Sequence, residues 1–291
     1  MKYKYYIFIR IYLERMKIPH SSNHPSLDII EIQPTQSKRR PILFIHGANM
    51  SAWCWNEQFM PFFASLGHPC YALSLRGHGN SGGHQQLMTN SIADYVTDVQ
   101  RVVEQLDETP ILVGHSLGGL VVQKYIEHQT VPACILLASV PSDGMLPSLM
   151  DLALYNPSFY TQLNLIQFFG TWSTAVDVAR KAIFSGHVED EVVIRYCAQM
   201  QPESPKALLD ALWLGIPSKK NPFKVPMLAL SADEDTFFRP EHIKETAKAY
   251  GADYVNMKET SHAMMLDSHW QQSADAIKHW LNGLEHEPLQ S

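Results

Sequence analysis

The sequence predicts an α/β protein with a mostly parallel central sheet, helices on both faces of that sheet, and an inserted helical region. Short apolar runs rich in β-forming residues alternate with segments whose apolar residues recur at helical spacing. Strands that alternate with helices are joined by right-handed crossovers, which produce a parallel sheet covered on both sides. The alternation stops between residues 141 and 222, where only helical patterns are found.

The predicted elements follow one another in a regular order. Strands are expected at residues 42–45, 70–75, 111–113, 134–138, 227–230 and 254–257. Helices are expected at residues 56–65, 92–106, 117–128, 241–250 and 270–281. The segment "SLDIIEIQP", near residue 30, precedes them, and we predict that it forms an antiparallel strand at the edge of the sheet.

We divide the chain into four parts: an N-terminal extension (1–24), the first part of an α/β core (25–140), an inserted helical lid (141–222) and the second part of the core (223–291). The stretch "MKYKYYIFIRIYLER" is apolar, but Arg10 interrupts it and no small-residue cleavage site follows. It is too short to span a bilayer. We favour an extra edge element, or a segment upstream of a start at Met16, over a surface-bound segment.

Composition excludes some partners. The formal net charge of −6 provides no basic field for nucleic acid or anionic lipid, and we expect neither a nucleic-acid partner nor a stable membrane span. The four cysteines form no C-x-x-C pair, and Cys70 and Cys134 fall in predicted buried strands. Free thiols of this kind favour a reducing compartment, the cytoplasm. The sequence leaves the oligomeric state open.

A serine stands at an unusual place in "PILVGHSLGGL". Gly114, Ser116 and Gly118 match the G-x-S-x-G nucleophile elbow, a sharp strand-to-helix turn that lifts a serine hydroxyl above the sheet. The apolar run before it and the helical pattern after it provide the required context. The alternative is a glycine-rich turn without chemistry.

Five segments together resemble the α/β-hydrolase superfamily, over about residues 27–283. They are "FIHGAN", "LSLRGHGNSGG", "VGHSLGG", "LALSADEDTFFRP" and "ETSHAMMLD", in that order. The resemblance implies the α/β-hydrolase fold and a catalytic triad of Ser116, Asp235 and His262. It also implies an oxyanion hole made by the backbone amides of Ala48 and Leu117.

The acid has rivals in the same segment, Asp233 and Glu234, and a more distant one in Asp143. Asp235 is favoured because the acid of the family's turn stands three residues after a glycine position, which is Ala232 here. That alanine is one departure from the family pattern. The other is Ser74, where an aspartate is common, and neither departure touches the triad.

The lid is rich in aromatic residues, and most of these are expected to pack in the core. We assign part of the substrate pocket to four aromatic residues: Trp53, Phe168, Phe169 and Trp172. The glycine-rich "RGHGNSGG" lacks the Lys-Ser/Thr of a phosphate-binding loop, so we expect a structural loop that borders the pocket. His115 is also expected to be structural, because the elbow points neighbouring side chains apart.

A serine at the elbow, rather than an aspartate, suits acyl transfer. We expect a serine hydrolase that cleaves carboxylic esters of small molecules. The expected substrates are uncharged acyl esters, either lipid-like esters or monoesters. The sequence implies no metal or organic cofactor. Two alternatives stay open. One is thioester or carbon–carbon bond hydrolysis on the same triad, and the other is a non-catalytic member that only binds a ligand.

Overall fold

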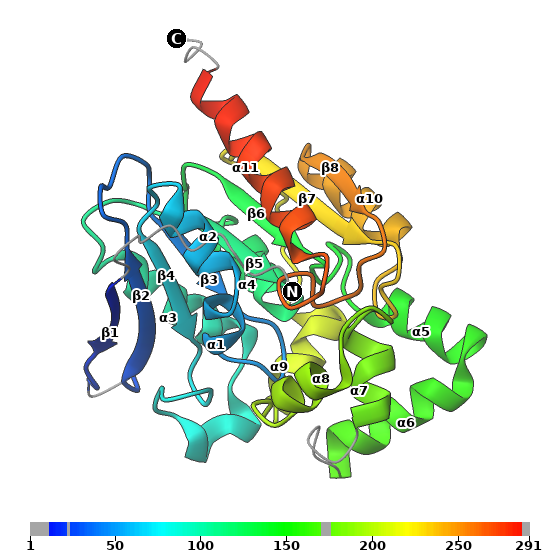
Figure 1. Cartoon of the computed structure of the whole chain (residues 1–291). Coiled ribbons are helices and arrows are strands. Elements are labelled where there is room, and N and C mark those ends of the chain that lie inside the picture. The colour runs from blue at the N-terminus through cyan, green and yellow to red at the C-terminus, as the bar shows by residue number, and fades with distance from the viewer. Residues whose placement is uncertain (1–11, 22–23, 170–175, 287–291) are drawn as a thin grey trace.

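A twisted eight-stranded sheet forms the centre of the described chain (Figure 1). The structure is a computed structural model that describes residues 12–21, 24–169 and 176–286. The strand order is β1-β2-β4-β3-β5-β6-β7-β8, and every neighbouring pair from β4 to β8 runs parallel. The strands are β1 (Tyr12–Ile18), β2 (Leu27–Gln33), β3 (Ile42–Ile45), β4 (Cys70–Ser74), β5 (Ile111–His115), β6 (Cys134–Leu137), β7 (Met227–Ala232) and β8 (Asp253–Met257).

The antiparallel strand predicted near residue 30 is β2, but its predicted place at the sheet edge is wrong. β2 pairs with β4 on one side and with β1 on the other, and both pairings are antiparallel. The β1 register runs from Tyr12 opposite Gln33 to Ile18 opposite Leu27. The described part of the N-terminal segment therefore supplies the edge strand.

The helices follow the predicted order with one correction. They are α1 (Trp53–Asn56), α2 (Phe59–Ser65), η1 (His84–Thr89), α3 (Ile92–Val103), α4 (Leu117–Tyr125), α5 (Leu146–Tyr155), α6 (Pro157–Phe169), α7 (Val176–Ile183), α8 (Asp190–Cys197), α9 (Pro205–Leu209), η3 (Asp210–Leu214), α10 (Pro240–Tyr250) and α11 (Trp270–His286). The single helix predicted over residues 56–65 is wrong, because α1 and α2 replace it. Pro61 lacks an N–H and would clash with the preceding turn, so a new helix begins at Phe59 and places this proline in its first turn.

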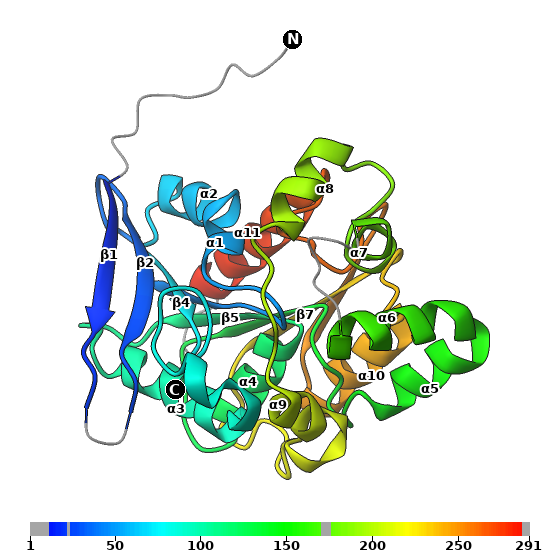
Figure 2. The same cartoon turned by 90° about the horizontal axis from the view of Figure 1, so that it is seen from below.

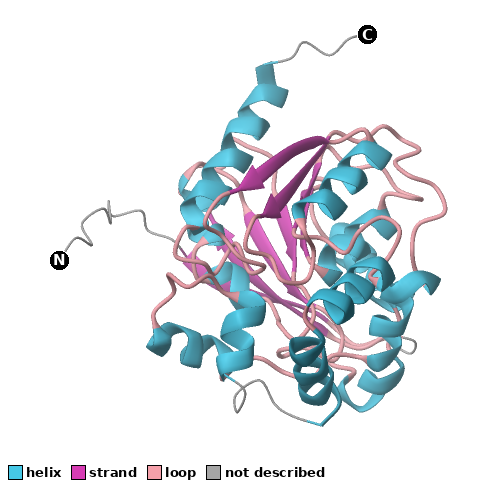
Figure 3. Ribbon diagram, turned by 90° about the vertical axis from the view of Figure 1, so that its right-hand side faces the viewer, coloured by secondary structure: helices cyan, strands magenta, loops and turns pink. Residues whose placement is uncertain are grey.

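Two apolar cores cover the two faces of the sheet. The strands supply both, since successive side chains point to opposite faces: Ile42 and Phe44 of β3 lie in one core and Leu43 and Ile45 in the other. Helices α1, α2 and α11 pack on the first face, and α3, α4 and α10 on the second, as Figure 2 shows from below. Figure 3 shows the twist of the sheet between these helical layers.

The inserted helical region predicted between β6 and β7 is present. Helices α5 to α9 gather on one side of the molecule (Figure 1). Hydrogen bonds tie the end of α7 to the loops after β7 and β8: Thr236 Oγ1 donates to the Lys181 carbonyl at 2.8 Å, and the Ala263 amide donates to the Ile183 carbonyl at 2.9 Å. The insertion is therefore seated against the carboxyl edge of the sheet.

All four cysteines are free and buried. Burial raises the pKa of each thiol, that of Cys197 to about 11, so these groups stay protonated and unreactive at neutral pH. Within the described ranges, no helix is both long enough and apolar enough to cross a bilayer.

Candidate active site

Ser116 stands at the sharp turn between β5 and α4. Its backbone has φ 51° and ψ −116°, a strained conformation for a residue with a side chain. The flanking glycines are required by close backbone approach. A Cβ on Gly118 would lie 2.4 Å from the His46 carbonyl oxygen, and one on Gly114 would lie 2.5 Å from that of Gly118. The strand-to-helix turn predicted from the sequence is confirmed.

The loops after β7 and β8 bring His262 and Asp235 together. His262 Nδ1 lies 2.9 Å from Asp235 Oδ2, and the Asp235 side chain is fully buried. The other carboxylate oxygen, Oδ1, accepts hydrogen bonds from the amides of Phe237 and Phe238 at 2.8 and 3.1 Å. Their rings also flank the imidazole, with centroids 4.8 and 5.5 Å from its own. Both the orientation of the carboxylate and that of the imidazole are fixed.

The rival acids point elsewhere. The Asp233 carboxylate pairs with Lys258 at 3.5 Å in the neighbouring turn. Glu234 and Asp143 are exposed. Of the four acidic residues considered, Asp235 is the one whose carboxylate meets His262.

His115 contacts the same histidine from the elbow. Its Nε2 lies 3.0 Å from the His262 carbonyl oxygen, and the two ring centroids are 4.8 Å apart. Burial lowers the pKa of His115 well below its usual value, so this ring is neutral and its Nε2 carries the donated proton. Within the described residues, the Ser116 hydroxyl forms no hydrogen bond with His262 in this structure. Such bonds are often long before substrate binds.

The backbone amides of Ala48 and Leu117 belong to two segments that lie side by side. The β3 loop (residues 46–50) lies against the elbow, since a Cβ on Gly47 would come within 2.9 Å of Ser116 Cβ. Leu117 is the first residue of α4, where an N–H has no acceptor within the helix. Neither this amide nor that of Ala48 donates to any residue that the structure describes.

A buried polar cluster near the site escaped sequence analysis. It joins the β4 loop (residues 75–83) to the return segment of the insertion (residues 198–204). His78 Nε2 lies 3.1 Å from Glu203 Oε2 with both side chains fully buried, and the Tyr95 hydroxyl donates to Glu203 Oε1 at 2.6 Å. Burial alone would lower the pKa of His78 and raise that of Glu203. The attraction between the two charges outweighs the effect of burial, so the pKa of His78 is raised and that of Glu203 is lowered. They form an ion pair.

The aromatic residues assigned to a substrate pocket are placed in part. Trp53 is half-buried and stacks on Tyr196 of α8, with ring centroids 5.6 Å apart. Its indole N–H is buried and has no hydrogen-bond partner among the described residues. Phe168 and Phe169 end α6, but their side chains lie outside the described part of the structure, as does the whole of Trp172. Trp53 thus lies where the insertion meets the core.

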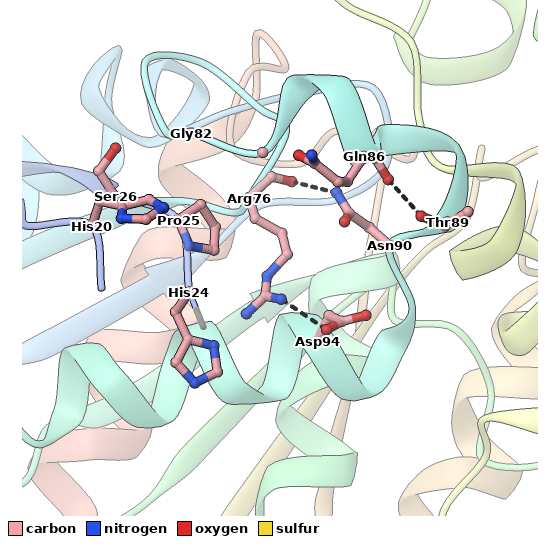
Figure 4. A pocket seen from close by; sticks show the side chains of 11 residues that line it. His20, His24, Pro25, Ser26, Arg76, Gly82, Gln86, Thr89, Asn90 and Asp94 are labelled. Carbon is pink, nitrogen blue, oxygen red and sulfur yellow. Dashed lines mark hydrogen bonds and ion pairs between the residues drawn. The ribbon is translucent and has the colours of Figure 1, made fainter. Parts of the chain in front are cut away.

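A separate polar cleft lies between residues that connect β1 to β2, the β4 loop, η1 and the start of α3 (Figure 4). Arg76 lines it, but this cation is already paired with buried Asp98 at 2.7 Å and with Asp94 at 2.7 Å. The charge of Arg76 is therefore balanced within the protein. The cleft contains none of the candidate catalytic side chains.

Known proteins similar to this chain include esterases and haloperoxidases. Methyl jasmonate esterase 1 of Vitis vinifera is 36% identical over 94 residues, which cover 32% of this chain and 35% of that protein. A non-heme chloroperoxidase of Streptomyces lividans is 35% identical over 105 residues, 35% of this chain and 37% of the relative. The chain thus spans little more than a third of the length of each of these relatives.

Solved structures extend the similarity to the whole fold. A bromoperoxidase from Bacillus anthracis superposes with a TM-score of 0.71 at 20% identity and covers 93% of this chain and 100% of that one. A family model described as the alpha/beta hydrolase family matches residues 42–276, well over half of the chain. The chain therefore belongs to the alpha/beta hydrolase family.

Proposed function

We propose that this protein is a serine hydrolase that cleaves carboxylic esters through Ser116, His262 and Asp235. The observation that carries the proposal is the buried 2.9 Å contact between His262 Nδ1 and Asp235, next to a serine held in a strained elbow. A neighbouring base and an orienting acid are what a serine needs to become a nucleophile at neutral pH. Similarity to a methyl jasmonate esterase supports the same reaction class.

Each group has a proposed step that its contacts support. The Asp235 carboxylate only accepts hydrogen bonds, so His262 carries its proton on Nδ1 and presents the Nε2 lone pair. His262 takes the hydroxyl proton of Ser116 as the Ser116 oxygen attacks the ester carbonyl carbon. His262 then gives that proton to the leaving alcohol. Water, activated in the same way, releases the acid from the acyl-enzyme and restores Ser116.

The amides of Ala48 and Leu117 are the proposed donors to the tetrahedral oxyanion. Both lie beside the elbow, and both are without acceptors among the described residues. Such preorganised donors stabilise charge that develops in the transition state, and the loss of one costs about 10²–10³ in kcat in a serine protease.

The substrate proposed is a small, uncharged acyl ester. Aromatic rings of Phe237 and Phe238 surround the base, and Trp53 and Tyr196 line the junction of core and insertion. An apolar lining of this kind favours an apolar acyl chain over a charged one. We keep the helical insertion as the proposed lid, and the cytoplasm as the proposed compartment because all four thiols are free.

The test is hydrolysis of p-nitrophenyl esters of graded chain length by wild type, Ser116→Ala and a control, Ser65→Ala, which alters an exposed serine. The control should match wild type, while Ser116→Ala should lose turnover by several orders of magnitude, about 10⁶-fold in a serine-protease precedent. Circular dichroism checks that both variants fold. A folded Ser116→Ala variant that keeps most of the wild-type kcat would contradict the proposal.

The assay also separates the alternatives. A parallel panel of acyl thioesters is assayed in the same way. If wild type binds esters but turns over neither the esters nor the thioesters, the result would favour a ligand-binding protein. Thioester turnover much faster than ester turnover would keep the triad but change the substrate class.

A further inference from the structure

Gln201, in the return segment of the helical insertion, bridges two loops of the core. Its backbone N–H donates to the Asn49 carbonyl at 3.0 Å, and its own carbonyl accepts from Asn49 Nδ2 at 3.0 Å. Its side chain spans the β4 loop, since Oε1 accepts from the Gly79 amide at 2.8 Å and Nε2 donates to the Gly77 carbonyl at 2.9 Å. Every hydrogen-bonding group of the residue's backbone and amide is used.

At its start the β3 loop is held by the His46 ring, which lies 2.8 Å from the Gly47 carbonyl oxygen, but beyond Gly47 its own backbone holds its shape weakly. It is a turn closed by a hydrogen bond from the Met50 amide to the Gly47 carbonyl, at a long 3.4 Å. Asn49, the third residue of this turn, has φ 66°, a left-handed conformation that residues with a side chain adopt at a cost. The two shorter contacts with Gln201 are made by this strained residue, one position after Ala48.

The β4 loop, in contrast, is a firm anchor. Arg76 at its start makes a buried two-nitrogen pair with Asp98, at 3.0 and 2.7 Å, and a second pair with Asp94 that Figure 4 shows. The Ser81 hydroxyl donates to the Ser74 carbonyl at 2.5 Å. A side chain bound to this loop is therefore bound to the rigid core of the protein.

We propose that Gln201 is a positioning residue that fixes the β3 loop so that the Ala48 amide points at the substrate oxyanion. The role deepens the proposed function, on which the part played by Ala48 rests. Gln201 touches no reacting atom; it ties Asn49 to Gly77 and Gly79 and thereby sets the direction of the adjacent amide. Because Gln201 follows α8 by a few residues, the seating of the insertion and the geometry of the oxyanion hole are coupled.

The matched pair for a test is Gln201→Met and Gln199→Met. Methionine keeps the length of glutamine but removes both amide groups, and Gln199 lies exposed in the same return segment. Gln201→Met should lower kcat by about 10- to 100-fold, below the limit set by complete loss of a donor. KM should stay within about twofold of wild type, since oxyanion contacts form in the transition state. Gln199→Met should match wild type in both constants.

Amide hydrogen exchange gives a readout that needs no substrate. The peptide that contains residues 46–50 should exchange faster in Gln201→Met than in wild type or Gln199→Met. An inactive wild type would then count against the proposed function alone, because the exchange experiment still decides whether Gln201 holds the loop.

Either of two results with Gln201→Met would overturn the role of Gln201. One is a folded Gln201→Met variant with wild-type kcat and unchanged exchange at residues 46–50. The other is a loss of activity that appears entirely in KM. If Gln201→Met fails to fold, Gln201→Glu keeps the acceptor for the Gly79 amide and should give an intermediate kcat, while wild-type kcat in that variant would also contradict the role.

Discussion

The carboxylate of Asp235 has no freedom left in this structure. One oxygen meets His262 Nδ1 and the other accepts two amides, those of Phe237 and Phe238, with no exposed side-chain surface. A carboxylate anchored in this way holds the imidazole in one tautomer and stabilises the imidazolium that forms during the reaction. The nearby Asp233 has none of these contacts, which makes it a natural control.

Replacing this acid by its amide tests the assignment. Asp235→Asn should lower kcat by about 10⁴-fold, as in the serine-protease precedent, because an amide NH2 facing Nδ1 favours the wrong tautomer. Asp233→Asn should cost far less, since it loses only the 3.5 Å contact with Lys258. Both variants are compared on the same ester, and the reverse ranking would transfer the role to Asp233.

Sequence motifs located these residues because each lies in the loop that follows a strand. The acid and the histidine come after β7 and β8, at the positions that the family resemblance implies, and the structure brings them into contact. The sequence predicts a structural role for His115, but not its contact with the His262 carbonyl, because that partner is 147 residues away in the chain. The contacts of Gln201 are not predicted either, because its partners lie in two other loops.

The elbow depends on how closely β3 and α4 approach each other. The Cβ of an alanine at 118 would meet the backbone carbonyls of His46 and Ile45, and backbone atoms cannot move aside as a flexible side chain can. The space that this glycine leaves is what allows Ser116 to stand beside the β3 loop.

Gly118→Ala should therefore destabilise the protein by about 1–3 kcal/mol or more, as overpacking of a tight interior does, and should reduce ester turnover. Gly283→Ala is the control, because Gly283 lies in α11 with nothing within 4 Å of an added Cβ. That variant should gain about 0.5–1 kcal/mol from helix propensity. Urea denaturation measures both, and equal stabilities would contradict the close approach.

The ion pair between His78 and Glu203 joins the insertion to the core and should make stability depend on pH. The pKa of His78 is raised, so the stabilisation is complete below the unfolded value of about 6.5 and is lost as the pH rises through the folded pKa. The pKa of Glu203 is lowered, so its share is retained above about pH 4.5. The ring centroid of His46 lies 5.1 Å from that of His78. Burial lowers the pKa of His46 to about 3, so His46 stays neutral above about pH 4.5.

The free energy of unfolding should consequently differ more between wild type and Glu203→Gln at about pH 6 than at about pH 9. Glu245→Gln, which changes an exposed carboxylate on α10, serves as the control and should show no such trend. Urea titrations at the two pH values measure the difference. A gap that is the same at both would mean that the pair is not charged in the folded protein.

The sequence predicts the position of a strand or helix well where the pattern of apolar residues alone determines it. The strands of the parallel core could be placed because each is a short apolar run between turn residues, and six such runs became strands. The split of one expected helix into α1 and α2 follows from a single proline at 61. An extra edge element is one of the two alternatives that the sequence leaves open for the N-terminal segment, and β1 is such an element. Its pairing with β2 could not be derived, because the sequence does not say which strand lies beside an edge.

For the whole molecule, the parallel sheet is what gathers the site. Ser116 follows β5, the β3 loop follows its neighbour, and the acid and histidine follow β7 and β8, so their groups meet at one edge of the sheet. The helical insertion then sits on this edge, held to the β7 and β8 loops. The match over residues 42–276 shows the family. The proposal for the substrate depends on the residues of the site, because the fold does not determine the substrate.

If Ser116 is an activated nucleophile, as we propose, it should react covalently with an electrophilic probe. Wild-type protein is treated with a fluorophosphonate, which reacts with activated serines, and the modified peptide is located by mass spectrometry. We predict a single adduct on Ser116, no adduct in Ser116→Ala, and much slower labelling in His262→Gln. Folded wild-type protein that stays unlabelled, or that carries the label on another serine, would show that Ser116 is not the activated nucleophile.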